Sequence, residues 1–272
     1  MSAALILGVF ICLFPAGGHA AGPDFPPVSE LLTPTADLPR EELRDSVAEL
    51  PSLESFQEAV RSREPRLRRD AVVAMGRPGN AAAIPYLSAV LLRLDEAPAV
   101  RVAAAEALGH IGDRRAWKFL AEAVEDMDEK VRFAATLALG RVDADANVAR
   151  LEQILRKDPS WWVRYAAAMA MGGTRKAFTA SWLERAACED STWQVRFQAV
   201  LALGELGTPR AAEALGRVLS DPEGSVRSAA AMSLGRIGGA QSAFILGRAL
   251  VYEQDSGVRS ILHLALRKVQ GA

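Results

Sequence analysis

The sequence is poor in the residues that build most catalytic and metal-binding sites. It has two cysteines and three histidines among 272 residues. Two cysteines are too few for a disulfide framework, and three scattered histidines leave little with which to ligate a metal. The charges nearly cancel, with 32 basic and 33 acidic residues, so the cationic surplus typical of nucleic-acid-binding domains is missing. The composition therefore argues against a nucleic-acid partner and against a disulfide-stabilised fold.

The sequence also lacks the short motifs that mark nucleophiles, metals and phosphate sites. It contains no G-x-S-x-G, no H-E-x-x-H and no Walker loop. The acidic turn Asp143–Asp145 does not have the ligand pattern of a calcium loop. Cys188 has no histidine near it in sequence, which favours a small buried apolar role over a nucleophile. We expect no catalytic residue, no metal and no cofactor.

The amino terminus has the features of a secretory leader. Residues 1–20 carry no Lys, Arg, Asp or Glu, and Leu5–Phe14 is an uninterrupted apolar run. Gly18 and Ala20 place small residues at the −3 and −1 positions of a cleavage site. The run is too short to cross about 30 Å of hydrocarbon, although a buried first helix remains an alternative. We predict a signal peptide over residues 1–20, a secreted or periplasmic protein, and no membrane span after cleavage.

The segment behind the leader predicts a linker that leads into a repeat domain. Six prolines fall between residues 23 and 51, which indicates an extended tail or linker over residues 21–40. Residues 41–64 show weaker helical spacing and predict a degenerate opening helix pair. Clear repeats begin at residue 65, so the predicted repeat domain covers residues 41–272.

From residue 65 onward the chain repeats itself. Segments such as VRVAAAEALG, VRFAATLALG and VRSAAAMSLG recur with their arginines 31 to 33 residues apart. A period of this length indicates stacked structural units. The seven repeat arginines are Arg68, Arg101, Arg132, Arg164, Arg196, Arg227 and Arg259.

The pattern inside each unit predicts two antiparallel helices. Counting from the arginine as position 0, apolar or small residues fall at −1, +2, +3, +6 and +7, which form one helix face. Glycine at +8 in six copies predicts the end of this first helix. A second helical stretch follows, as in Ala116–Val124. Such pairs bury their apolar faces only by stacking, so we predict an all-α solenoid of about seven helix pairs.

An acidic residue stands six positions before the arginine in six copies. Near a helix start it can cap the helix and favour its dipole. Repeated in register, the acids and arginines could also form a ladder of ion pairs between stacked units. We predict a structural role for both groups, with an anion-binding row of arginines as the alternative. The acids are Asp95, Asp126, Asp158, Asp190, Asp221 and Glu253.

The phrase V-R-x-A-A-x-A-L-G, preceded by an acid, resembles the HEAT-like repeats of the phycobilisome-lyase type. The resemblance covers roughly residues 52–272. It implies a curved stack with first helices outside and second helices on the concave side, joined by an Asp–Arg ladder. The patterns of tetratricopeptide and ankyrin repeats are missing.

Two enzyme groups share this type of repeat. Deoxyhypusine hydroxylases are similar but carry His-Glu pairs that hold two irons, and this sequence has no His-Glu dipeptide. Outside the leader, its histidines are His110 and His263, several repeats apart. Bilin lyase subunits act in the cytoplasm, which conflicts with the leader. The resemblance alone therefore does not predict a catalytic centre.

The scarce aromatic residues gather in the middle repeats. Only 6% of the chain is aromatic, yet positions +1 and +5 of three consecutive first helices are aromatic or large and apolar. Position −3 is tryptophan in two of these helices, and Trp162 stands beside the first of the two. These side chains either pack at the repeat junctions, or form an exposed strip that docks a partner, a second copy or the Pro-rich tail, or stack on a ligand such as a glycan. The candidate partner-binding residues, called the aromatic strip below, are Phe133, Leu137, Trp161, Trp162, Tyr165, Met169, Trp193, Phe197 and Leu201.

These observations favour an exported, non-catalytic HEAT-like protein that binds other proteins as a scaffold or assembly factor. We expect a protein partner of unknown identity, possible self-association, and no nucleic acid. The alternative function is a lyase- or hydroxylase-like enzyme, or an accessory subunit of one.

Overall fold

The structure, a computed structural model, describes residues 59, 61–143, 146–174 and 176–271. The chain divides into two compact units, Met1–Leu50 and Pro51–Ala272, and the described residues all lie in the second. The predicted signal peptide, the Pro-rich linker and most of the degenerate opening pair lie outside the described residues.

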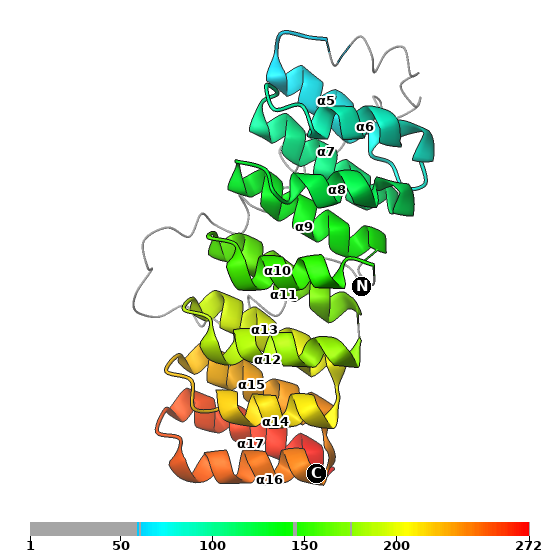
Figure 1. The fold of residues 1–272 in the computed structure, drawn as a ribbon. Helices are drawn as coiled ribbons and strands as arrows, with labels where there is room; N and C mark the ends of the chain where they lie inside the picture. The colour runs from blue at the N-terminus through cyan, green and yellow to red at the C-terminus, as the bar shows by residue number, and fades with distance from the viewer. Residues whose placement is uncertain (1–58, 60, 144–145, 175, 272) are drawn as a thin grey trace, which may run out of the picture. The chain divides into compact units, whose positions relative to one another are not determined.

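The described residues form a stack of helices in two layers, with no strand among them (Figure 1). The predicted all-α solenoid is confirmed. The first helices form one layer: α5 (Pro65–Met75), α7 (Pro98–Ile111), α9 (Glu129–Asp143), α11 (Trp161–Thr174), α13 (Trp193–Leu206), α15 (Gly224–Ile237) and α17 (Ser256–Gln270). The second helices form the other: α6 (Ile84–Leu91), α8 (Trp117–Ala123), α10 (Val148–Lys157), α12 (Ala180–Glu189), α14 (Pro209–Val218) and α16 (Gly239–Tyr252).

The core follows the repeat pattern. In α13, Val195, Ala199 and Leu203 are completely buried, on the face that the spacing predicts. Burying a leucine such as Leu203 contributes roughly 1.5–3 kcal/mol. The small alanines let neighbouring helices come close, which explains the high alanine content.

Local signals start several helices. Thr208 caps α14, since its hydroxyl accepts a 3.1 Å hydrogen bond from the Ala211 N–H. Proline occupies the first turn of α5, α6, α7 and α14, where its missing N–H has no cost. Three short 3-10 helices lead into α6, α8 and α12. They are Ala81–Ala83, Arg114–Ala116 and Ala177–Thr179.

The prediction that the +8 glycine ends each first helix is wrong for five of its six copies. Only Gly76 stands at a helix end, whereas Gly109 and Gly204, for example, lie inside α7 and α13. The left-handed residues come later, as at Gly112 (φ 70°) and Gly207 (φ 63°). The +8 position needs glycine for space, because a Cβ on Gly109 would lie 2.8 Å from the Ala138 Cβ of the next first helix.

Candidate functional site

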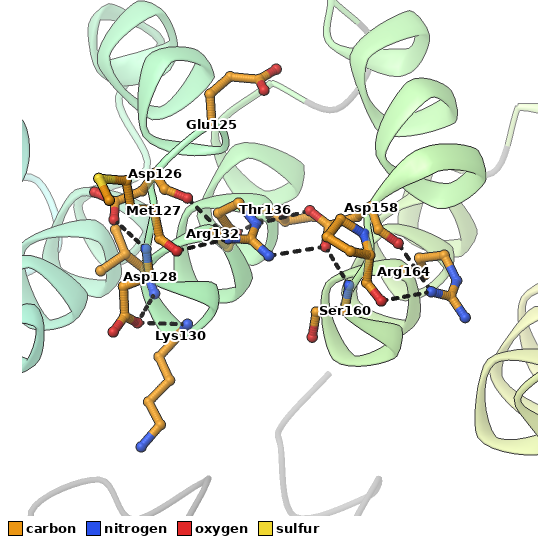
Figure 2. A network of polar contacts seen from close by, with 12 residues as sticks. Glu125, Asp126, Met127, Asp128, Lys130, Arg132, Thr136, Asp158, Ser160 and Arg164 are labelled. Atoms are coloured by element: carbon orange, nitrogen blue, oxygen red, sulfur yellow. Dashed lines mark hydrogen bonds and ion pairs between the residues drawn. The ribbon is translucent and has the colours of Figure 1, made fainter.

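A ladder of charged side chains joins successive repeats (Figure 2). Arg164 donates from Nε and Nη2 to both carboxylate oxygens of Asp190, at 2.8 and 2.9 Å. Its Nη1 donates to the backbone carbonyl of Asp158, at 3.0 Å. Asp158 in turn accepts from Arg132, at 2.9 and 3.2 Å. Five of the seven repeat arginines each bind a carbonyl of the turn before their own helix and the carboxylate of the next turn: Arg68, Arg132, Arg164, Arg196 and Arg227.

The ladder carboxylates are also turn caps. Besides the arginine, Asp158 accepts a 2.8 Å hydrogen bond from the Ser160 N–H, and Asp190 accepts one of 2.9 Å from the Thr192 N–H. In the ion pair nearest the carboxyl end, hydrogen bonds from Arg227 lower the pKa of the Glu253 carboxyl below its ordinary value, although burial acts in the opposite direction. The predicted ladder describes this geometry, whereas the predicted capping of the helices is wrong, because the N–H groups belong to Ser160 and Thr192, which precede α11 and α13. We call each arginine–carboxylate ion pair of the ladder a closed rung. The closed rungs are Arg68–Glu96, Arg101–Asp126, Arg132–Asp158, Arg164–Asp190, Arg196–Asp221 and Arg227–Glu253.

The prediction of Asp95 as a ladder residue is wrong. Asp95 is exposed, and its neighbour Glu96, only 6% exposed, pairs with Arg68. Burial alone would raise the pKa of the Glu96 carboxyl, but hydrogen bonds from Arg68 and the Ala97 N–H bring it below its ordinary value. In this repeat the pairing acid stands five residues before the following arginine, Arg101, and not six.

Arg101 departs from the ladder geometry. It makes one 2.7 Å contact to Asp126 through Nη1, and its buried Nε has no hydrogen-bond partner. At the other extreme, Arg259 keeps the bond from Nη1 to the Glu253 carbonyl, at 3.0 Å. No described carboxylate pairs with its Nε or Nη2.

The aromatic strip lies at the junctions between first helices and is mostly half-buried. Phe133 of α9 packs edge-on against Trp162 of α11, with ring centroids 5.9 Å apart. Trp193 packs against Phe197, which is 7% exposed. Burial raises the pKa of Tyr165 to about 12. This geometry matches the packing alternative, and a role in partner binding stays a prediction.

A groove of about 370 Å³ opens between α10 and α12, beside the Arg164–Asp190 rung. It combines both charge signs with an indole, which sequence reasoning missed because these residues come from separate helices of different repeats. The Trp182 ring also meets Phe178 edge-on, with centroids 5.9 Å apart. The charged and aromatic residues that line the groove, apart from those of the ladder, are Glu152, Arg156, Trp182, Arg185 and Glu189.

Cys188 is exposed on α12, so the prediction of a buried apolar cysteine is wrong. Desolvation nevertheless raises the pKa of its thiol above the ordinary value, although Arg217 opposes the shift. A raised pKa keeps the sulfur in its less nucleophilic thiol form near neutral pH. Nothing in this geometry prepares Cys188 as a nucleophile.

Comparison with known proteins explains the repeats. A family model described as HEAT repeats matches residues 89–172 and 179–267. The chain belongs to the HEAT repeat family. The X-ray structure of Escherichia coli YibA overlays with a TM-score of 0.53 at 16% identity, covering 86% of this chain and 98% of YibA, which supports the fold alone. The predicted HEAT-like repeats are confirmed.

Curated relatives of this HEAT protein are enzymes. Deoxyhypusine hydroxylase of Eremothecium gossypii is 40% identical over 76 residues, covering 28% of this chain and 24% of that enzyme. Deoxyhypusine hydroxylase-B of Oryza sativa subsp. japonica is 36% identical over 96 residues, covering 35% and 32%. The matched region thus spans about a quarter to a third of these relatives' length.

These relatives correct the predicted function. The favoured expectation was a non-catalytic scaffold that is not an enzyme, and that expectation is contradicted by relatives that carry an enzyme's name. The hydroxylase-like alternative has the better support. The absence of short catalytic motifs therefore does not outweigh the similarity to these relatives.

The iron centre implied by the hydroxylase resemblance does not fit the described residues. No group of three or more His, Cys, Asp or Glu side chains among them is placed to hold a metal. His110 lies on α7 and His263 on α17, far apart in the stack (Figure 1). The ladder carboxylates are already committed to arginines and backbone N–H groups.

None of the described helices is long and apolar enough to cross a membrane.

Proposed function

We propose that this HEAT protein acts in the enzymatic modification of a protein, as a hydroxylase-like enzyme or as the repeat subunit of one. The observation that carries the proposal is the 40% identity to a deoxyhypusine hydroxylase over 76 residues, 28% of this chain. In this function the described repeats bind and position the protein substrate. No chemical step is assigned to them, because their donor groups do not fit the implied metal.

The groove between α10 and α12 is the substrate-binding surface that the geometry supports best. Glu152 and Glu189 offer carboxylates, Arg185 offers a guanidinium, and Trp182 offers an apolar ring. Arg185 and Glu189 are exposed, so both are available to a polypeptide. The neighbouring Arg164–Asp190 rung fixes the groove, since its bidentate pair ties α11 to the turn after α12.

Peptide binding and oxygen transfer test this function separately. A peptide carrying deoxyhypusine is titrated into the full-length chain, followed by fluorescence anisotropy. We expect binding that Arg185→Glu and Glu189→Arg each weaken, whereas the exposed Arg236→Gln on α15 serves as a matched control with no effect. If wild type and the two groove variants bind alike, the groove assignment fails.

Activity is measured in extracts of the native source by the gain of one oxygen atom on the peptide. We expect this gain to disappear when the chain is depleted with an antibody, and to return when recombinant chain is added. Undiminished hydroxylation after depletion would contradict the proposed function.

We also propose export, on the strength of the apolar run and small-residue site in residues 1–20. The amino-terminal sequence of the protein isolated from its native source tests this, and we expect it to begin at Ala21. A mature chain that retains Leu5–Phe14 would overturn the leader and with it the secreted or periplasmic location.

A further inference from the structure

Helices α16 and α17 lie together at the carboxyl end of the stack (Figure 1). The two helices expose different kinds of side chain. In the inner first helices, position +4 faces the core or the next repeat and is completely buried. In α17 the same position is His263, which is exposed. The six inner residues at this position are Val72, Ala105, Thr136, Ala168, Val200 and Ala231, all with 0% exposure.

The α17 half of this end is closed to a further repeat. Its +8 position is Arg267, whereas the inner first helices have glycine there. At Gly140, a Cβ would lie 2.6 Å from the Ala170 Cβ of the following first helix. An arginine in that position prevents another first helix from approaching as closely. Ser260 and His263 are also exposed, so the exposed side chains of α17 are mostly polar, with Leu264, 57% exposed, as an apolar exception.

The α16 half has an apolar surface instead. Phe244, Val251 and Tyr252 are 66%, 70% and 75% exposed. They occupy positions i, i+7 and i+8 of one helix, and therefore lie on one face. The exposed residues of the preceding second helix, α14, are mostly polar, including Arg210, Glu213 and Arg217. Neighbouring second helices thus differ sharply in what they expose.

The packing of α16 on α14 shows what would fit on α16. Ile245 of α16 lies over Gly216 of α14, where a Cβ would stand 3.2 Å from the Ile245 Cγ2. Gly247 lies 31 residues after Gly216, one repeat spacing further. A Cβ on Gly247 would meet nothing within 4 Å. The space above Gly247 in α16 therefore corresponds to the space above Gly216 in α14, which Ile245 fills. We call this space the glycine acceptor, and at Gly247 no aliphatic side chain fills it.

The ladder supplies a second, independent match at the same end. The turn after α14 gives Asp221 to Arg196, and the turn after α16 gives Glu253 to Arg227. By the same geometry, the turn after a helix packed on α16 would give its carboxylate to Arg259. Arg259 is exposed and uses only Nη1 for a described hydrogen bond, to the Glu253 carbonyl. Its Nε and Nη2 are the pair that binds a carboxylate in the inner rungs.

The charge of this end selects an acidic partner and disfavours a second copy. Exposed basic residues there are Arg248, Arg259, Arg267 and Lys268. Glu253 is neutralised by Arg227, and Asp255, which caps α17, offsets only one of these four basic side chains. Two such ends would repel each other, whereas an acidic helix is attracted.

We propose that α16 binds a single amphipathic helix of a partner protein, which places a branched aliphatic side chain over Gly247 and a following carboxylate on Arg259. The spacing follows from α16 itself, where Ile245 precedes Glu253 by eight residues. This docking surface follows from the repeat geometry and stands independently of the enzymatic function.

A peptide with the sequence of residues 239–256, held helical by a side-chain staple, is the probe, since it carries Ile245 and Glu253 at the required spacing. Its binding to the full-length chain is measured by fluorescence anisotropy at low salt. We expect Gly247→Ile, which fills the acceptor, to weaken binding by more than tenfold. Arg259→Gln is expected to weaken it by roughly tenfold, the loss of one charge-assisted pair. Arg236→Gln, on α15, is the matched charge control and leaves binding unchanged.

A second peptide, with Glu253→Gln, tests the carboxylate contact directly. We expect it to bind wild type and Arg259→Gln equally, because the pair is absent in both cases. Far-UV circular dichroism confirms that Gly247→Ile folds, as the open space above that glycine predicts. Failure of the helical peptide to bind, or equal binding by Gly247→Ile and Arg236→Gln, would overturn the proposal. So would a wild-type dimer in sedimentation equilibrium that Gly247→Ile dissociates, since the occupant would then be a second copy.

Discussion

The same arginine has different surroundings inside the stack and at its carboxyl end. Arg196, inside, is bidentate to Asp221, and the two side chains are 11% and 5% exposed. Arg259, at the end, is exposed and bonds only a backbone carbonyl. The difference shows that a rung needs two successive repeats. The repeat motif supplies the arginine, and the turn of the next repeat supplies the carboxylate with which it pairs.

The largest expected effect separates these two arginines. Arg196→Met should lower the free energy of unfolding by about 3–5 kcal/mol, because it leaves the buried Asp221 carboxylate without its counter-ion. Arg259→Met strands no carboxylate, so its effect should stay within about 0.5 kcal/mol. Urea unfolding followed by far-UV circular dichroism measures both. Equal losses for the two variants would show that the motif, and not the rung, carries the stability.

A somewhat smaller effect is expected at the +8 position. Gly140→Leu forces a side chain against Ala170 and should cost about 1–3 kcal/mol through overpacking. Arg267→Leu occupies the same register at the end of the stack, where no helix follows among the described residues. Its melting temperature should remain close to that of wild type. A marked loss at Arg267, or none at Gly140, would contradict the close-packing explanation for these glycines.

Sequence reasoning reached the fold because the repeat encodes local packing. Spacing alone identifies which residues of α13 face the core, and the regular acid identifies five of the six ladder carboxylates. It misplaced Asp95 because the pairing acid of this repeat, Glu96, stands five and not six residues before Arg101. It misread the +8 glycines because the pattern shows a small residue but not which neighbour requires it.

The groove and the end surface could not be predicted from one repeat at a time. Trp182 and Glu152 lie on different second helices, and only the stack brings them to one groove. The acceptor at Gly247 became recognisable only after Ile245 was seen over Gly216. The preference for a non-catalytic protein failed for another reason: missing motifs do not exclude an enzyme whose relatives share only part of their length with the chain.

Acid should weaken the last closed rung in a defined direction. The folded pKa of Glu253 is below its ordinary value of 4.5, chiefly because of the hydrogen bonds from Arg227. The rung's contribution is therefore complete above about pH 4.5 and is lost as the pH falls through the folded pKa. Glu253→Gln should be less stable than wild type at pH 7 and should lose less stability on acidification. Parallel pH profiles from urea unfolding would contradict this assignment.

The smallest expected effect concerns the aromatic side chains and appears only in alkali. Tyr165, half-buried inside the stack, has its pKa raised to about 12 from an ordinary value of 10.0, because burial disfavours the charged phenolate. Its contribution to stability is present below pH 10 and is lost as the pH rises through 12. The tyrosinate absorbance that Tyr165→Phe removes should therefore appear near pH 12 and not near pH 10, in a difference titration against wild type. At neutral pH the two proteins should melt at nearly the same temperature, since the ring is retained. A difference signal centred near pH 10 would mean that Tyr165 is as solvated as an exposed ring such as Tyr252, which is 75% exposed on α16, and the aromatic strip would then be an open surface.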